Sequence, residues 1–408
     1  MSLPLFIARK YIRSKKNSGF ISFISAITII GIALGVAVLI IAITVLNGFE
    51  NAVTDKIINL NSHIKITGFG DRNLPSYKNV IPKIQNRLDT NLKSISPFVA
   101  KYAVIGSKRF DEGITLLGLH KELDNSNIKK YIVEGEYKFG KTNDLSNLII
   151  GKKLADKLFL KLGSKVTLFG LRGDKPPSLD YPPVIQQFII TGIYESGMSK
   201  YDDEIIYSDM KTVQQMFEVG DQVSGYNIQV TDISKVDLLA DDLHVFLGYP
   251  YYARSIFKVH QSIFSWLELQ RKPIPLILGL IIIVAVFNIV GTILMLVLER
   301  TKDIGILKSL GARRNSIIKL FIYQGLYLSF IGIAFGNAAA FILSKLQKEL
   351  EIISIPDSVY FISKVPISIE WEIYFIISAI AFTLCLLASI IPSLIASKIS
   401  PISAIRFE

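Results

Sequence analysis

The chain has 408 residues, of which 50% are hydrophobic, and its formal net charge at pH 7 is +11. Charged residues are absent from four stretches, 17–49, 273–298, 320–344 and 373–397, which are 33, 26, 25 and 25 residues long. A bilayer core of roughly 30 Å needs about 20 helical residues, so each stretch is long enough to cross a membrane. This pattern excludes most classes of soluble enzyme and predicts an integral membrane protein.

The distribution of the basic residues predicts the orientation in the membrane. The first 16 residues carry five basic residues and no acid, and residues 299–319 carry six basic residues against two acids. Short loops rich in lysine and arginine stay in the cytoplasm, which places both termini and the 299–319 loop there. Residues 49–270 hold 27 basic and 26 acidic residues. This near-balance argues against a basic patch for nucleic acid.

In chain order, we expect a cytoplasmic N-terminus at 1–19 and a first transmembrane helix at 20–47. The apolar run of this helix is much longer than the core of a cleaved signal peptide. Gly31 and Gly35 form a small-xxx-small pair that permits close approach of another helix. Together with Asn47 and Asn288, they are candidates for helix packing or for a lipid path, and packing is the commoner role of such residues.

Residues 48–272 are predicted to form one large mixed α/β domain on the periplasmic side. Enrichment in β-branched residues and alternation of apolar residues predict strands. These are at 62–69, 95–107, 114–119, 165–169, 186–194, 204–208 and 225–232. Apolar spacing of three and four predicts helices at 80–89, 152–159, 209–217, 236–248 and 259–270. The segments 48–60 and 259–270 would connect this domain mechanically to the membrane.

A proline-rich segment interrupts the predicted strands at 170–185. Its two Pro-Pro pairs lack backbone donors, so it cannot be central sheet. We interpret about 170–187 as a long hairpin with a stiff, extended tip. An ordinary surface loop explains the pattern equally well, although a loop of this length is unusual enough to suggest a binding role.

Three chemical signals are rejected as sites. GEYKFGKT at 135–142 matches the phosphate-binding pattern, but a poor helix start follows it where the nucleotide site needs a helix. The four histidines show no metal-ligand spacing, and Asp241, Asp242 and His244 are interpreted as a solvated helix face. The single cysteine, Cys385, lies in an apolar stretch. We therefore predict no metal, no cofactor and no catalytic residues in this chain.

After the domain, we expect transmembrane helices at 273–298, 320–344 and 371–395, a short periplasmic loop at 345–370 and a cytoplasmic tail at 396–408. The cytoplasmic loop at 299–319 begins with ERTKDIGILKSLGA, whose apolar residues predict a short amphipathic helix. Gly311 is placed to end that helix. Such a helix docks into a groove of a protein partner or rests on lipid, and the pattern favours neither.

Three segments carry a resemblance to a known family. Residues 17–50, 275–312 and 391–406 resemble FtsX-like, MacB-type ABC permeases, and in particular the lipoprotein-releasing permeases of the LolC/LolE/LolF type. Residues 176–203 resemble the hook of that branch, which recruits a periplasmic lipoprotein carrier. The resemblance covers essentially the whole chain.

The resemblance implies a non-catalytic permease subunit. It implies as partners a separate cytoplasmic, LolD-like ABC ATPase that binds ATP and Mg, a second identical or homologous permease subunit, a LolA-like periplasmic carrier, acylated lipoproteins and membrane lipid. It implies localisation in the bacterial inner membrane. The ATPase-coupling residues would be Arg300, Asp303, Ile304, Gly305, Ile306, Leu307, Leu310 and Gly311. The carrier-binding hook would use Arg172, Pro176, Pro177, Leu179, Tyr181, Pro182, Pro183, Gln186 and Gln187.

Other function classes remain open at this point. A MacB-like efflux or export permease is one alternative, although such exporters usually carry their own ATPase domain. An FtsX-like regulator of a cell-wall hydrolase is another, although its outer domain is much smaller. A membrane enzyme is the most distant alternative, because no catalytic constellation is visible.

Overall fold

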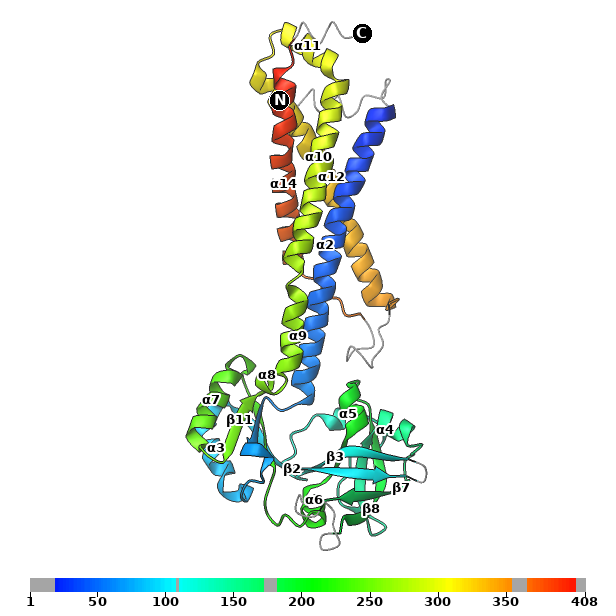
Figure 1. Cartoon of the computed structure of the whole chain (residues 1–408), viewed down its shortest axis with the longest axis vertical. Helices are drawn as coiled ribbons and strands as arrows, with labels where there is room; N and C mark the ends of the chain where they lie inside the picture. Colours follow the sequence, from blue (N-terminus) through cyan, green and yellow to red (C-terminus); the bar gives the residue numbers. More distant parts are fainter. Residues whose placement is uncertain (1–18, 108–109, 172–181, 354–364, 401–408) are drawn as a thin grey trace. The chain divides into compact units, whose positions relative to one another are not determined.

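The computed structural model describes residues 19–107, 110–171, 182–353 and 365–400. The chain divides into two compact units, one formed by residues 52–266 and the other by the segments before and after them. Four of the described helices are long and apolar enough to cross a membrane. In chain order, the first of them begins before the 52–266 unit and continues into it, and the other three follow the unit (Figure 1).

The helical unit is built on α2 (Gly19–Leu60), α10 (Ile274–Glu299), α12 (Arg314–Leu350) and α14 (Trp371–Lys398). The short helix α9 (Gln261–Arg271) precedes α10, and α11 (Thr301–Ser309) follows it. Buried aliphatic side chains from all four long helices form one core. In this core, α2 packs against α10, α12 and α14. Helix α14 contains Pro392.

Six strands of the α/β unit close into a barrel. They are β2 (Leu92–Gly106), β3 (Asp111–Leu119), β9 (Ile205–Asp209), β6 (Leu145–Gly151), β8 (Val184–Tyr194) and β7 (Lys165–Gly170). Each strand pairs with the next in that order, and β7 pairs back with β2. The pairs β3–β9 and β6–β8 are parallel, and the others in the ring are antiparallel. The two short strands β4 (Ile132–Gly135) and β5 (Lys141–Thr142) add to β8 and β6.

The first half of β2 leaves the barrel and carries a second, three-stranded lobe. β10 (Gly225–Val230) pairs with residues 92–98 of β2, β1 (Ile64–Gly68) pairs with β10, and β11 (Tyr251–Ser255) pairs with β1. All these pairs are antiparallel. The helices α3 (Ile81–Leu88) and α7 (Val236–Leu247) cover the apolar face of this lobe.

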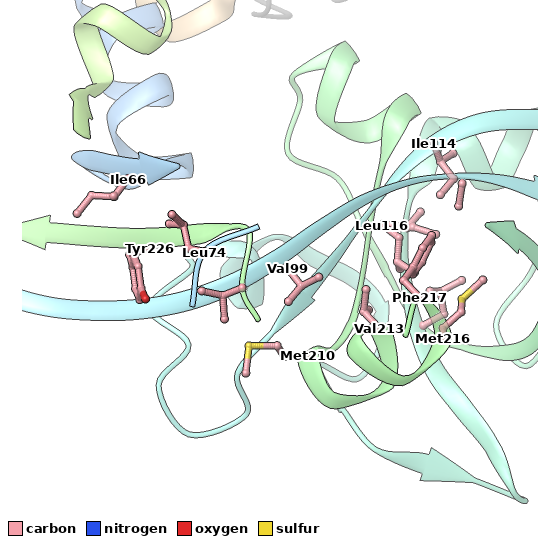
Figure 2. Packing of buried hydrophobic residues seen from close by; sticks show 14 of the residues in the cluster. Ile66, Leu74, Val99, Ile114, Leu116, Met210, Val213, Met216, Phe217 and Tyr226 are labelled. Carbon is pink, nitrogen blue, oxygen red and sulfur yellow. The ribbon is translucent and has the colours of Figure 1, made fainter. Parts of the chain in front are cut away.

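One hydrophobic core runs through both lobes, because β2 belongs to both. Figure 2 shows Ile66, Leu74 and Tyr226 in the three-stranded lobe and Leu116, Val213 and Phe217 against the barrel. The short helices α4 (Lys152–Lys157), α5 (Ser199–Glu204) and α6 (Met210–Met216) complete the barrel's cover, and α8 (Ile256–Val259) follows β11. Gly118 on β3 allows α6 to approach, since a Cβ there would lie 2.9 Å from Cγ2 of Val213.

All seven strands and all five helices expected in this domain form at the expected places, with small differences at their ends. Four strands were missed, namely β4, β5, β6 and β11. The GEYKFGKT segment contains β5, and Asn143 and Asp144 then turn at positive φ into β6. A hairpin therefore stands where a nucleotide site would need a helix. Asp241 and Asp242, expected on a solvated face, form exposed ion pairs with Lys258 and Arg87.

Candidate functional site

The candidate coupling surface is α11, which begins immediately after α10. Arg300 caps the C-terminus of α10, and its Nη1 lies 3.1 Å from Oδ2 of Asp303. Thr301 Oγ1 donates a hydrogen bond to the carbonyl of Val297, one turn back in α10. The helix ends at Ser309, and Gly311 follows the C-cap residue Leu310 with a φ of +92°, in the left-handed region that glycine tolerates.

The two faces of α11 differ in exposure. Ile304 is 2% exposed and packs into the core of the helical unit, and Gly305 is also buried. Ile306 is 53% exposed and Leu310 is 80% exposed, while Leu307 lies at the edge of the core. Of the eight predicted coupling residues, Ile304 and Gly305 are therefore buried within their own chain, whereas Ile306 and Leu310 form the exposed apolar surface. The contact of these residues with a partner stays a prediction.

Lys308 ties α11 to the end of the last long helix. Its Nζ donates hydrogen bonds to the carbonyl oxygens of Ser397 and Ile399, at 2.7 and 2.6 Å. Arg314 Nε donates to Ser397 Oγ at 3.1 Å, from the first turn of α12. Carbonyls at the C-terminus of a helix lack partners within that helix, and a lysine is a suitable donor to them. The arrangement joins α11, α12 and α14 at one polar junction.

The candidate carrier-binding hairpin has its two arms in β7 and β8. They pair antiparallel from Lys165↔Ile189 to Gly170↔Val184. Arg172, Pro176, Pro177, Leu179 and Tyr181 lie outside the described residues. Pro182 and Pro183 are exposed, as is Gln187, whereas Gln186 is half-buried and donates to Ser146 Oγ at 3.3 Å.

Apolar side chains gather at the base of this hairpin. Ile185 and Phe169 are directly paired across β7 and β8, and Val104 is paired with Phe169 across β2 and β7. Exposed Tyr102 lies on the same strand as Val104. A cavity of about 470 Å³ opens here, between the base of the hairpin and the strand pair β2–β3. These residues were not predicted, although alternation along KYAVIG places Tyr102 and Val104 on one face of β2.

The predicted packing residues of the first long helix contact the second. A Cβ on Gly31 would lie 2.2 Å from Nδ2 of Asn288, and a Cβ on Gly35 would lie 3.4 Å from Cγ2 of Ile281. One turn before Gly31, the Thr28 and Thr292 hydroxyls are hydrogen-bonded at 2.5 Å. Asn47 Nδ2 donates to Oε2 of Glu370 at 3.5 Å, where the chain leads into α14.

A second small-xxx-small pair, Gly332 and Gly336 on α12, was missed in the sequence. A Cβ on Gly332 would lie 2.8 Å from Cβ of Ile32, and a Cβ on Gly336 would lie 2.7 Å from the carbonyl oxygen of Ala33. The two glycines therefore set how closely α12 approaches α2. The same four-residue spacing that marked Gly31 and Gly35 was present in the sequence here as well.

The C-terminal part of α2, from residue 52 on, belongs to the α/β unit and is held within it by polar contacts. Lys56 Nζ donates to the carbonyl of Gly197 at 2.9 Å, and the Tyr201 hydroxyl donates to Oδ1 of Asn61. The 195–201 loop is itself held by Asp202, which is 1% exposed. Its carboxylate accepts hydrogen bonds from Ser196 N and Oγ and from Gly197 N, at 2.7–2.9 Å. Burial raises the pKa of this carboxyl, and these hydrogen bonds oppose the shift.

No group of metal-ligating side chains is present among the residues that the structure describes. His63 and His260 are each partly buried, and burial lowers the pKa of both. The described part of the chain thus offers exposed apolar surfaces, close helix packing, a cavity at the base of a hairpin, and polar junctions between elements.

The fold defines a membrane protein with several apolar helices and a mixed α/β domain. The family model of the MacB-like periplasmic core domain matches residues 25–244, more than half of the chain, and the chain belongs to this family. The model of the FtsX-like permease C-terminal matches residues 275–401.

Two relatives are similar over the full length. The chain is 28% identical over 426 residues to "Lipoprotein-releasing system transmembrane protein LolC" of Neisseria meningitidis serogroup B, covering 100% of both chains. It is 28% identical over 419 residues to the LolE protein of the same system in Haemophilus influenzae, covering 98% of both. The periplasmic region of MacB from Actinobacillus actinomycetemcomitans aligns with 51% of this chain and 94% of its own, at 13% identity and a TM-score of 0.33. The relatives confirm the resemblance to lipoprotein-releasing permeases.

Proposed function

We propose that this chain is a permease subunit of an ATP-driven, lipoprotein-releasing ABC complex. The complex extracts acylated lipoproteins from the inner membrane and passes them to a periplasmic carrier. The observation that carries this proposal is the similarity to lipoprotein-releasing transmembrane proteins along the whole chain, through both the α/β domain and the C-terminal helices.

The proposed topology has four transmembrane helices, with the α/β domain between the first and the second. Both termini and the 299–319 loop are cytoplasmic, and the domain is periplasmic. Three features support this arrangement, namely the four apolar helices, the position of the domain in the element order and the basic residues in the short loops.

Energy for extraction comes from a separate cytoplasmic ATPase, which binds the ATP and Mg. Each buried CH₂ holds a lipid anchor in the membrane by about 0.8 kcal/mol, so an acyl chain does not leave without coupled work. The ATPase docks on α11 through the exposed side chains of Ile306 and Leu310. Lys308 and the buried Ile304 then pass the movement of α11 to α14 and to the core of the helical unit.

The carrier docks at the hairpin formed by β7 and β8. Support comes from the exposed apolar residues at its base and from the adjoining cavity, which is lined by Tyr102, Val104 and Phe169 among others. Gln187 projects from the exposed face of β8 and supplies a polar contact. A second permease subunit, identical or homologous, completes the complex.

Depletion of the chain in its native host, followed by fractionation of the inner and outer membranes, tests the proposal. We expect acylated lipoproteins of the outer membrane to accumulate in the inner membrane within the depletion period. Normal sorting combined with impaired septation would contradict the proposal and favour a regulator of cell-wall hydrolysis. Normal sorting with loss of resistance to exported compounds would favour an efflux permease.

A further inference from the structure

Two half-buried cations lie side by side on the face of the three-stranded lobe that is turned away from α3 and α7. Lys65 on β1 is directly opposite Arg254 on β11, and on its other side it is opposite Asn227 on β10. The core-facing residues of β11 are Ala253 and Ser255, so Arg254 and Lys65 lie on the face turned away from α3 and α7. Like charges at directly opposed positions destabilise a strand pair, so this arrangement needs a compensating partner.

Neither cation has a carboxylate partner among the described residues. Lys65 and Arg254 form no ion pair within that part of the chain. The ammonium of Lys65 lies 5.0 Å from the centre of the Phe98 ring, and the guanidinium of Arg254 lies 5.1 Å from that of Tyr252. Nε of Arg254 is buried without a hydrogen-bond partner, which costs free energy unless something accepts that hydrogen.

A polar cavity adjoins Lys65 in the cleft between the two lobes. Its volume is about 120 Å³, well above the roughly 10–15 Å³ that one water needs. Lys65 is the one charged residue among the described residues that line it, and the polar ones include Asn61, Asn125, Asn227 and Gln229. Asn227 Oδ1 accepts a hydrogen bond from Ser62, so its Nδ2 is a donor for a ligand.

The electrostatics of the neighbourhood favour an anion. Burial and the charge of Arg254 lower the pKa of Lys65, and the charge of Asp71 opposes this with a smaller effect. Burial, then Lys65 and Lys200, lower the pKa of the nearby His260. Neighbouring positive charge thus adds to the effect of burial on both groups, and an anion beside Lys65 would favour the charged forms of Lys65 and His260.

We propose that this cavity binds a phosphate group, held by the ammonium of Lys65 and the side-chain amide of Asn227, with Arg254 as the second cation on the same face. Phosphate fits better than a carboxylate, because its oxygens are arranged tetrahedrally and can accept from the Lys65 ammonium and the Asn227 amide in different directions. Its source is the headgroup of a phospholipid or free inorganic phosphate. The inference does not depend on the proposed transport function.

The experiment uses the full-length protein in detergent, titrated with sodium phosphate by calorimetry at constant ionic strength. We expect saturable binding, weakened about tenfold or more in Lys65→Met, because a hydrogen bond from a charged donor is lost. Lys165→Met is the matched control, since Lys165 is an exposed lysine on another strand of the same domain. It should bind phosphate like the wild type.

Thermal unfolding provides a second readout that a merely structural lysine would not give. Without phosphate, Lys65→Met should be at least as stable as the wild type, because the like-charge pair is removed. Phosphate should raise the midpoint of the wild type and leave that of Lys65→Met unchanged. If Lys65→Met does not fold, Arg254→Met serves for the same comparison.

Replacing phosphate with glycerophosphoethanolamine distinguishes the two sources. Equal or tighter binding of this diester identifies a lipid headgroup, and binding of inorganic phosphate alone identifies the free ion. Two results would overturn the proposal. These are no binding beyond that of sodium chloride, and unchanged phosphate binding in Lys65→Met.

Discussion

Single side chains determine how α11 is joined to the rest of the helical unit. The two carbonyls that accept from Lys308 belong to the end of α14, about 90 residues further along the chain. A lysine within an amphipathic helix is ordinarily read as a solvated charge, and neither spacing nor composition indicates its acceptors. The helix itself was therefore predictable from the sequence, whereas the role of Lys308 depends on the tertiary structure.

Replacing Lys308 with Met should uncouple the junction of α11 and α14. Two hydrogen bonds from a charged donor are lost, and each bond of this kind typically contributes about 1.5–3 kcal/mol. We expect less lipoprotein released per ATP hydrolysed in a reconstituted complex, with partial recovery in Lys308→Arg. Lys302→Met, an exposed lysine on the same helix, is the control. Equal coupling in Lys308→Met and Lys302→Met would show that the junction does not transmit movement.

His260 makes stability depend on pH. Burial, with Lys65 and Lys200 nearby, lowers the pKa of His260 to about 4. The unfolded chain then binds more protons than the folded one between about pH 6.5 and pH 4, so stability falls as the pH falls through this window. The loss at the acid end is roughly 3 kcal/mol. The midpoint of thermal unfolding of the full-length protein should depend less on pH in His260→Asn than in the wild type. The same slope of midpoint against pH in both proteins would contradict this assignment.

At the scale of elements, α11 presents one buried and one exposed face, and the two should respond differently to the same change. Ile306→Asp should leave the protein folded but abolish coupling of ATP hydrolysis to release, because it places a charge on the exposed apolar surface. Ile304→Asp should destabilise the fold by about 3–5 kcal/mol, because it buries an unpaired charge. Unfolding temperature and release rate, measured on both variants, separate the effects. A wild-type release rate in Ile306→Asp would rule out docking on this face.

The glycines of α12 give a second test at this scale. Gly336→Val should overpack the contact with α2, at a cost of about 1–3 kcal/mol, because a Cβ there already meets the backbone of Ala33. Gly291→Val is the matched control, since a Cβ at Gly291 on α10 meets nothing within 4 Å. Thermal unfolding in detergent should distinguish the two variants. Equal midpoints would mean that α12 and α2 do not approach each other this closely.

Most strands could be predicted because their apolar residues alternate or are β-branched. The missed strands lack one of these signals. In β6, the run from Ser146 to Gly151 is buried on both faces, and a fully buried strand does not alternate. β11 reads YYARS, in which Arg254 interrupts the apolar pattern. The proposed site at Lys65 and Arg254 could not be predicted either, because these two residues become neighbours only when β1 and β11 pair.

At the scale of the molecule, the sequence predicted the division into apolar helices and one α/β domain, because both follow from where charges are absent. It did not predict that six strands of the domain close into a barrel, since closure depends on β7 pairing with both β2 and β8. Nor did it predict that β2 would join the barrel to the three-stranded lobe. Such long-range pairing is set by tertiary contacts rather than by local pattern.

The central claim is that this chain releases lipoproteins using energy from a partner ATPase. The most direct test is reconstitution of the chain with its ATPase in liposomes that contain an acylated lipoprotein, followed by measurement of transfer to a soluble carrier. We expect transfer that requires ATP hydrolysis and is lost in Ile306→Asp. ATP hydrolysis by the intact complex with no lipoprotein transferred would contradict the account.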